Sequence, residues 1–142
     1  MNEPFGAESP SDDPLRRAAE AMRAVRERCV WSQRITHDDL VPYLVEESAE
    51  LIDAVETGTR ADLREELGDL LFAVVNVARF LKADPEIALN RTVEKFIERF
   101  QFIEKNAKRL GKNLKEMTLE EMDVLWDMAK IHKNKKKIKN TL

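Results

Sequence analysis

The sequence predicts an all-α protein whose core is a four-helix antiparallel bundle, with one additional helix. Charged residues make up 36% of the 142 residues and hydrophobic residues 43%, with only four glycines and five prolines. This balance is typical of long helices. Apolar residues recur at spacings of three and four in several long segments, as on the buried face of a helix. No segment alternates apolar and polar residues in the manner of a half-buried strand.

The first helix is expected to follow a polar N-terminal segment. Residues 1–13 are rich in Pro, Ser and Asp and predict a disordered segment. Asp13 followed by Pro14 is typical of a helix N-cap and its first position, so we expect a helix over about 14–29. Residues 30–38 are expected to connect this helix to the next.

The second and third helices are predicted to form an antiparallel hairpin. The second covers about 39–57 and ends at Gly58, a residue suited to a left-handed cap. Thr59 and Asp62 have the spacing of a capping box, so a third helix begins there and runs to about Lys82.

Two more helices complete the prediction. Asp84 and Pro85 start a fourth helix that reaches about Leu110. Thr118 and Glu121 have the spacing of another capping box and open a fifth helix that ends near His132. We therefore divide the chain into a disordered segment (1–13), one helical domain (14–132) and a basic C-terminal tail (133–142).

Composition excludes several classes of protein. A net charge of −3 gives no reason to expect a nucleic-acid partner. Cys29 is the one cysteine, which excludes an internal disulfide and a multi-cysteine zinc site. No apolar run reaches the roughly 18 residues of a membrane span, and the acidic, polar start does not resemble a signal peptide. We therefore expect a cytoplasmic protein without a membrane partner.

Lysine is distributed unevenly along the chain. It is absent before Lys82, where every basic side chain except histidine is arginine, and it dominates afterwards. One possible cause is drift within one gene. The other, which we favour, is a chain that combines two homologous sequences joined in or near the third helix.

Acidic pairs flank the apolar seams of the second and third helices. Glu47 and Glu50 are one turn apart beside an apolar stripe on the second helix. The stripe consists of Val41, Leu44, Val45, Leu51, Ile52 and Val55. Glu66 and Asp69 are likewise one turn apart beside the leucine seam of the third helix, which begins Leu63, Leu67 and Leu70. Because the helices are antiparallel, the four carboxylates can converge.

Four converging carboxylates would repel one another, and partly buried ones would take up protons. A hard divalent cation such as Mg²⁺ removes both penalties, because it prefers oxygen ligands and keeps waters that a phosphate can replace. The alternative is that these acids form solvated helix faces, to which we assign Glu46, Asp53, Glu56 and Glu65. Two acidic pairs on neighbouring helices favour the metal interpretation.

Several ordered motifs resemble one enzyme family. The segments EESAE and EELGD resemble the EExxE…ExxD signature of MazG-type nucleoside triphosphate pyrophosphohydrolases. CVWSQRITH, EKFIERFQFIE and LEEMDVLWDMAK resemble other segments of the family, so that the resemblance extends from about Cys29 to Lys130. It implies an all-α bundle, dimeric or tetrameric, that uses Mg²⁺, or Mn²⁺ as a substitute. It also implies cleavage of a nucleoside triphosphate to monophosphate and pyrophosphate.

The resemblance also implies roles for individual residues. The metal ligands would be Glu47, Glu50, Glu66 and Asp69, and Glu46 or Glu47 would take a proton from the attacking water. The substrate would be held by Lys95, Arg99, Trp126 and Lys130. The chain departs from the family pattern at Val30, Ser32 and Asp62, where family members carry proline, an acid and lysine respectively. The set of residues that holds the phosphates therefore differs in part from that of the family.

The substrate-binding candidates could have structural roles instead. Lys95 and Arg99 could belong to a salt-bridge lattice with the glutamates of the same helix, and Trp126 could be a core anchor. Two further candidates, Trp31 and His37, lie where we expect the mouth of the site. Asn76 shares a helical face with Asp69 and could bind substrate or form a buried polar bridge.

A non-catalytic alternative is a helical interaction module that uses the basic tail HKNKKKIKN to bind nucleic acid or an acidic partner. That tail is more simply explained as a solubilising end whose charge complements the helix C-terminus.

Overall fold

The computed structural model describes residues 13–141, and these residues form six α-helices and one short 3₁₀ helix, with no strand among them. The elements are α1 (Pro14–Arg28), α2 (Val30–Arg34), α3 (His37–Thr57), α4 (Arg60–Phe80), α5 (Pro85–Arg109), η1 (Leu114–Glu116) and α6 (Leu119–Thr141). The prediction of an all-α protein is confirmed. The predicted disordered segment lies outside the described residues except for Asp13, which caps α1 through its side chain.

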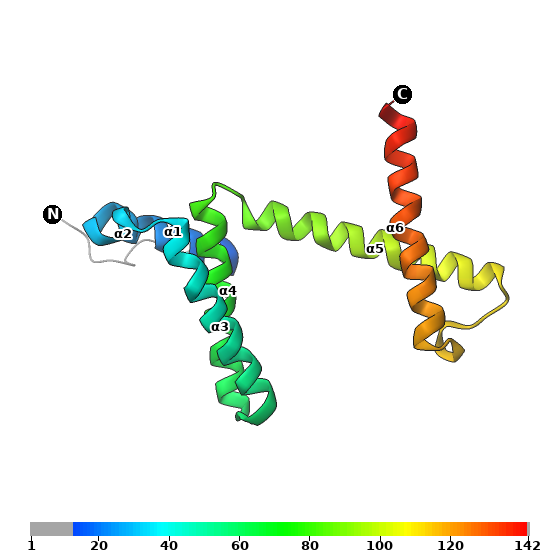
Figure 1. Cartoon of the computed structure of the whole chain (residues 1–142), viewed down its shortest axis with the longest axis horizontal. Helices are drawn as coiled ribbons and strands as arrows, with labels where there is room; N and C mark the ends of the chain where they lie inside the picture. The colour runs from blue at the N-terminus through cyan, green and yellow to red at the C-terminus, as the bar shows by residue number, and fades with distance from the viewer. Residues whose placement is uncertain (1–12, 142) are drawn as a thin grey trace. The chain divides into compact units, whose positions relative to one another are not determined.

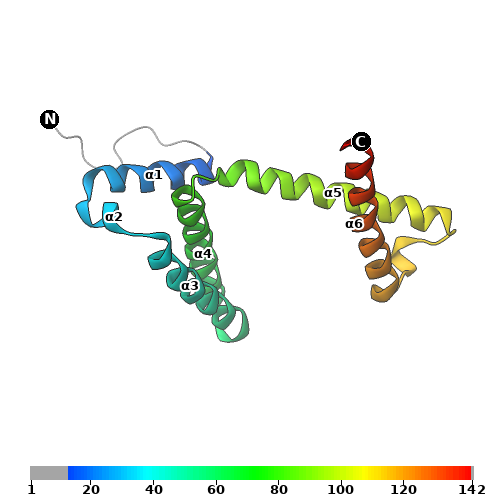
Figure 2. The ribbon, with the colours of Figure 1, turned by 45° about the horizontal axis from the view of Figure 1, so that its top comes forward.

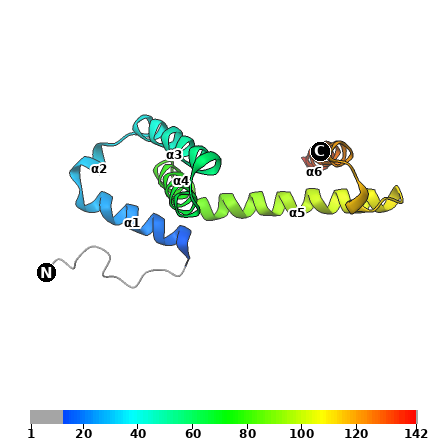
Figure 3. The ribbon, with the colours of Figure 1, turned by 90° about the horizontal axis from the view of Figure 1, so that it is seen from below.

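The described residues divide into two compact units, with the boundary between Ala88 and Leu89. In the first unit, α3 and α4 lie antiparallel and side by side in every view (Figures 1 and 2), and α1 packs against α4 (Figure 3). Small side chains let the two long helices approach closely, because Ala54 of α3 and Ala73 of α4 are both buried. This close hairpin is the scaffold on which the acidic pairs lie.

The second unit, from Leu89 onward, is built from α5 and α6. Its buried residues are Ile103 and Ala107 on α5 and Leu125 and Ala129 on α6. Two ring contacts join the helices: Phe96 with Trp126, at 5.6 Å between centroids, and Phe102 with His132, at 5.4 Å.

The segment predicted as a connection after α1 contains a helix. Residues Val30–Arg34 form α2, and α3 begins at His37 rather than near Asp39. The start of α3 is fixed by a capping box, in which Thr36 and Asp39 bind each other's backbone amides. This box has the same Thr-x-x-Asp spacing as Thr59 and Asp62, so the signal was present in the sequence.

Two further predictions about helix ends were wrong. Gly58 has a φ of −83°, so it is not a left-handed cap. It is small because a Cβ there would lie 2.8 Å from the backbone of Ala54. The last helix continues through the basic segment to Thr141 instead of ending near His132. Lysine favours helix, and its charge is favourable near a helix C-terminus, so nothing in this segment stops the helix.

The apolar stripe predicted on α3 is only partly covered within the first unit. Leu44 and Leu51 are half-buried. The remaining four members, Val41, Val45, Ile52 and Val55, are 52–66% exposed. The hairpin therefore presents an apolar surface that its own unit leaves open.

Candidate metal centre

The α3–α4 hairpin positions the acidic side chains. Gly58 and Thr59 join the helices, and the predicted capping box at Thr59 is confirmed. The Thr59 amide donates to the Asp62 carboxylate at 2.8 Å, and the Asp62 amide donates to the Thr59 hydroxyl at 3.2 Å. This pair of hydrogen bonds fixes the start of α4, and with it the register of Glu66 and Asp69 against α3.

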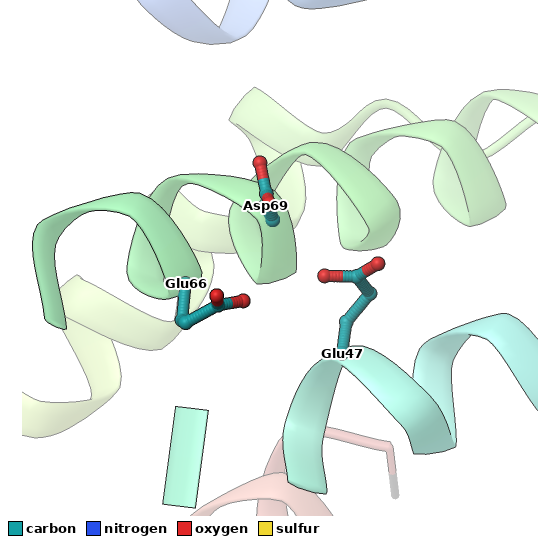
Figure 4. Close-up of side chains that lie close together, drawn as sticks. All are labelled: Glu47, Glu66 and Asp69. Atoms are coloured by element: carbon teal, nitrogen blue, oxygen red, sulfur yellow. The ribbon is translucent and has the colours of Figure 1, made fainter. Parts of the chain in front are cut away.

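Three of the predicted ligands come together. Glu47 of α3 and Glu66 and Asp69 of α4 each offer a carboxylate oxygen, and these oxygens lie within 4.8 Å of one another. Figure 4 shows Glu47 and Glu66 extending from the two helices toward each other, with Asp69 beside them. Glu47 is buried, Glu66 is half-buried and Asp69 is exposed, so the cluster lies at the edge of the hairpin and is open on one side.

The cluster is electrostatically unfavourable by itself. One oxygen of Glu47 and one of Glu66 are buried without a hydrogen-bond partner in the described part of the chain. Partial burial, followed by the charges of Glu50 and Asp69, raises the pKa of Glu66 above its ordinary value. Uncompensated buried carboxylates cost stability, so the arrangement favours a cation.

The donor set fits a hard divalent cation. All three side chains offer carboxylate oxygen, which Mg²⁺ and Mn²⁺ accept and which softer metals do not prefer. The orphaned oxygens of Glu47 and Glu66 are the atoms that such an ion would bind. The exposed side of Asp69 leaves room for water or a phosphate.

The other two acids of the signature take different positions. Glu50 is exposed and is not one of the three clustered residues, although its charge acts on Glu66. Glu46 is exposed. Both assignments, Glu50 as a ligand and Glu46 as a base, stay predictions.

Sequence reasoning did not single out Tyr43. A hydrogen bond from its hydroxyl to the Glu47 carboxylate, together with partial burial, raises the pKa of Tyr43. Tyr43 lies four residues before Glu47 on α3, so the i,i+4 spacing was the signal that could have found it.

The remaining candidates in the first unit are dispersed. Trp31 lies on α2 and is 71% exposed. His37 is the first residue of α3, with its Nε2 3.1 Å from the Asp38 carboxylate. Asn76 is half-buried on α4, where its side-chain carbonyl accepts a hydrogen bond from Arg79 at 3.3 Å. None of them is part of the acidic cluster.

The other four candidates lie in the second unit. The Arg99 guanidinium lies over the Trp126 ring, 5.4 Å from its centroid. Lys130 pairs with Asp127 at 3.1 Å, and Lys95 lies on α5. The salt-bridge lattice considered for α5 is not observed among the described residues, because Glu98 pairs with Lys133 of α6 at 2.8 Å. Their role in substrate binding stays a prediction.

Comparison with known proteins identifies the family. The profile of the MazG nucleotide pyrophosphohydrolase domain matches residues 35–108, which include the whole α3–α4 hairpin. The chain belongs to this family. The matched MazG domain contains all five acids of the signature, from Glu46 to Asp69.

Individual relatives support the same assignment. The uncharacterised protein YabN of Bacillus subtilis (strain 168) is 55% identical over 69 residues, which are 49% of this chain and 14% of the relative. The nucleoside triphosphate pyrophosphohydrolase/pyrophosphatase MazG of Thermotoga maritima is 43% identical over 81 residues, 57% of this chain and 32% of the relative.

A third relative matches more of the chain. The nucleoside triphosphate pyrophosphohydrolase of Escherichia coli (strain K12) is 36% identical over 125 residues, 84% of this chain and 48% of the relative. The chain thus spans less than half the length of each of these three relatives.

Proposed function

We propose that this MazG domain hydrolyses nucleoside triphosphates to nucleoside monophosphate and pyrophosphate in a Mg²⁺-dependent reaction. The observation that carries the proposal is the acidic cluster of Glu47, Glu66 and Asp69, in which a buried oxygen of each glutamate lacks a partner among the described residues. Family membership and relatives named as nucleoside triphosphate pyrophosphohydrolases support it. Because such a substrate is found in the cytoplasm, we propose that the protein acts there.

The acidic residues hold the cation, with Glu50 as a fourth ligand beside the three clustered acids. When bound, Mg²⁺ supplies positive charge that offsets the charge of the triphosphate. An oxygen of water then bonds to phosphorus while the bond to the leaving pyrophosphate breaks. Glu46 or Glu47 accepts the proton of the water. Because phosphoryl transfer depends mainly on positioning and electrostatics, no covalent nucleophile is needed.

The basic and aromatic candidates hold the substrate in this proposal. Lys95 and Arg99 contact the phosphates, for which Arg99 offers the fork-shaped donor group that suits phosphate oxygens. The further contacts with the nucleotide come from Trp31, His37, Asn76, Trp126 and Lys130. Support for this set comes from the family resemblance and from the direct contact between Arg99 and Trp126.

A product assay tests the activity. The chain is incubated with a mixture of nucleoside triphosphates with Mg²⁺ or with chelator, and pyrophosphate and monophosphates are measured. We expect both products only with Mg²⁺, and we expect Asp69→Asn to abolish their formation while the circular dichroism spectrum stays helical. Asp53→Asn, which changes an exposed acid of α3 outside the cluster, is the matched control and should keep full activity. Release of inorganic phosphate and a nucleoside diphosphate instead would refute the proposed reaction.

We also propose that two copies of the chain form a homodimer through the hairpin, with a tetramer as the next larger assembly. The exposed residues Val41, Val45, Ile52 and Val55 follow one another at spacings of three, four and seven along α3, so they form one stripe. Leu67, Leu71 and Val74 form a second exposed stripe on α4. Contiguous apolar surface of this kind is typical of an interface. Analytical ultracentrifugation should give twice the monomer mass of 16.4 kDa.

A further inference from the structure

A basic cleft in the first unit is not used by the proposed hydrolysis. It lies between α1 and the end of α4 that leads into α5, and it consists of two adjoining hollows of about 330 and 370 Å³. Both hollows are lined by Arg16, Ala19 and Arg79. Arg23 lines one of them and Lys82 the other. Four cationic side chains therefore face a space large enough for a small molecule.

Arg79 lines both hollows of the cleft, and it also lines a third, smaller hollow together with Arg26 and Asn76. Its Nε is buried without a hydrogen-bond partner, and its Nη2 donates to the side-chain carbonyl of Asn76 at 3.3 Å. No acid lies within ion-pair distance of it in the described part of the chain. Burial and the nearby charge of Arg26 lower the pKa of Arg79. Retaining a partly buried, unpaired cation costs stability, which an anionic ligand would offset.

Three acids line the cleft beside the four cations, and two of the acids are engaged in local contacts. Asp84 accepts the amides of Glu86 and Ile87 at 2.9 and 3.2 Å and so caps the start of α5. Glu86 pairs with Arg16 at 3.5 Å. Glu20 is the third acid in the lining, and no acid forms an ion pair with Arg23 or Lys82 among residues 13–141. The cleft is thus positive on balance.

Lys82 places a further cation in the lining of the cleft, at the C-terminal end of α4. Its φ is +56°, in the left-handed region that favours glycine and costs other residues about 1 kcal/mol. It follows α4 in this conformation, with its amide donating to the Arg79 carbonyl at 3.0 Å. A cation therefore lines the cleft at a backbone position where glycine would be more stable. This conformation ends α4, because the Ala83 amide also donates to the Ala78 carbonyl at 2.8 Å, as in a common helix C-terminal motif.

We propose that this cleft binds a small phosphate-bearing anion at a site separate from the acidic cluster. The fork of a guanidinium matches phosphate oxygens, and Arg16, Arg23 and Arg79 supply three such forks around one space. Arg79 lies ten residues after Asp69 on α4, so about 15 Å of helix separates the two sites. Pyrophosphate is too short to reach both.

Binding without metal separates this site from the proposed catalytic one. Inorganic pyrophosphate is titrated into the full chain in the presence of EDTA, and the heat of binding is measured by calorimetry. Without a cation the acidic cluster repels the ligand, so binding reports on basic sites alone. We expect saturable binding that Arg79→Met weakens by at least about tenfold, as loss of a charge-assisted hydrogen bond does. Arg64→Met, the same change at an exposed residue of α4 outside the cleft, is the matched control and should leave the affinity unchanged.

Two further variants probe the cleft and the acidic cluster separately. Arg23→Gln should also weaken binding, which keeps the test informative if Arg79→Met fails to fold. Asp69→Asn should still bind pyrophosphate in EDTA, whether or not it hydrolyses nucleotides. A failure of the proposed hydrolysis would therefore be distinguished from a failure of the proposed anion site. Absence of binding in EDTA, or binding lost in Lys95→Met and retained in Arg79→Met, would overturn the proposal.

The same titration distinguishes the possible ligands. Tighter binding of a nucleoside monophosphate than of pyrophosphate would identify a nucleotide site, and the reverse would identify a site for pyrophosphate. Citrate, a carboxylate of comparable charge, should bind at least about tenfold more weakly than the better phosphate ligand if the guanidinium forks select phosphate. Equal affinity for citrate would overturn the phosphate assignment.

Discussion

At the scale of single residues, Glu66 shows how the acidic cluster opposes the stability of the metal-free chain. Partial burial and the charges of Glu50 and Asp69 raise the pKa of Glu66 above the usual 4.5. The folded chain therefore binds a proton on Glu66 at a pH where the unfolded chain does not. By linkage, protonation of this residue stabilises the folded state as the pH falls through its raised pKa.

This sign leads to a prediction for the metal-free chain. In EDTA, the difference in Tm between Glu66→Gln and the unchanged chain should be largest at neutral pH, with the variant more stable. The difference should shrink as the pH falls toward 4.5, because Glu66 then becomes neutral in the unchanged chain as well. Thermal unfolding followed by circular dichroism between neutral pH and the glutamate range measures it. A gap that widens on acidification would contradict the raised pKa.

Tyr43 gives a second prediction at this scale. Tyr43→Phe removes the hydroxyl that bonds Glu47 but keeps the ring. Partners that orient metal ligands are worth about 10- to 100-fold in metal affinity, and the exposure of Tyr43 places it at the lower end of this range. We expect the Mg²⁺ concentration for half-maximal activity to rise about tenfold while the rate at saturating Mg²⁺ changes little. An unchanged Mg²⁺ dependence with a reduced maximal rate would assign Tyr43 a different role.

Sequence spacing predicted part of this site. The one-turn pairs placed Glu47, Glu66 and Asp69 on facing helices, because helical periodicity and a short hairpin are sufficient to bring them together. Spacing alone could not show that Glu50 lies outside the closest cluster, since that depends on side-chain rotamers and on the rotation of α3 about its axis. The basic cleft at Arg79 was also not foreseen, because its lining comes from segments about 60 residues apart in the sequence.

At the scale of helices, the predicted starts and ends lie within two residues of those observed, except that α2 was missed and the end of α6 was placed too early. The Thr59–Asp62 box predicted the start of α4 correctly, because both hydrogen bonds lie within four residues. The extent of α6 was underestimated because lysine-rich segments resemble solvated tails in composition, although lysine is compatible with a helix. The division into two units also has no local signal, since the boundary falls inside the continuous helix α5.

The box at Thr59 gives a prediction at this scale. Thr59→Ala removes the hydroxyl that accepts the Asp62 amide, and loss of such a cap costs about 1 kcal/mol. The free energy of unfolding, measured with urea near neutral pH, should fall by this amount. The bonds from Thr59 lower the pKa of Asp62 below 3.8, so the contribution of this carboxylate is present above that pH and disappears as the pH falls through the lowered pKa. Thr92→Ala, at an exposed threonine within α5, is the control.

At the scale of the whole molecule, each of the two units by itself leaves much apolar surface open. In the first unit the stripes on α3 and α4 are exposed, and in the second unit Phe96, Ile97 and Met128 are 46–57% exposed. Among the described helices, none is both long and apolar enough to cross a membrane. Pairing with a second copy would cover these surfaces and also agrees with the family resemblance. Since folding and association are then coupled, Tm should rise with protein concentration.

A single charge in the α3 stripe tests this coupling. Val45→Glu places a carboxylate in the proposed interface, whereas Val30→Glu makes the same change at a residue of nearly equal exposure on α2, 63% against 64%. We expect Val45→Glu to halve the mass measured by ultracentrifugation, to lower Tm and to abolish its dependence on concentration, because a buried unpaired charge opposes association. Val30→Glu should behave as the unchanged chain. If both variants keep the wild-type mass, the α3 stripe is not the interface.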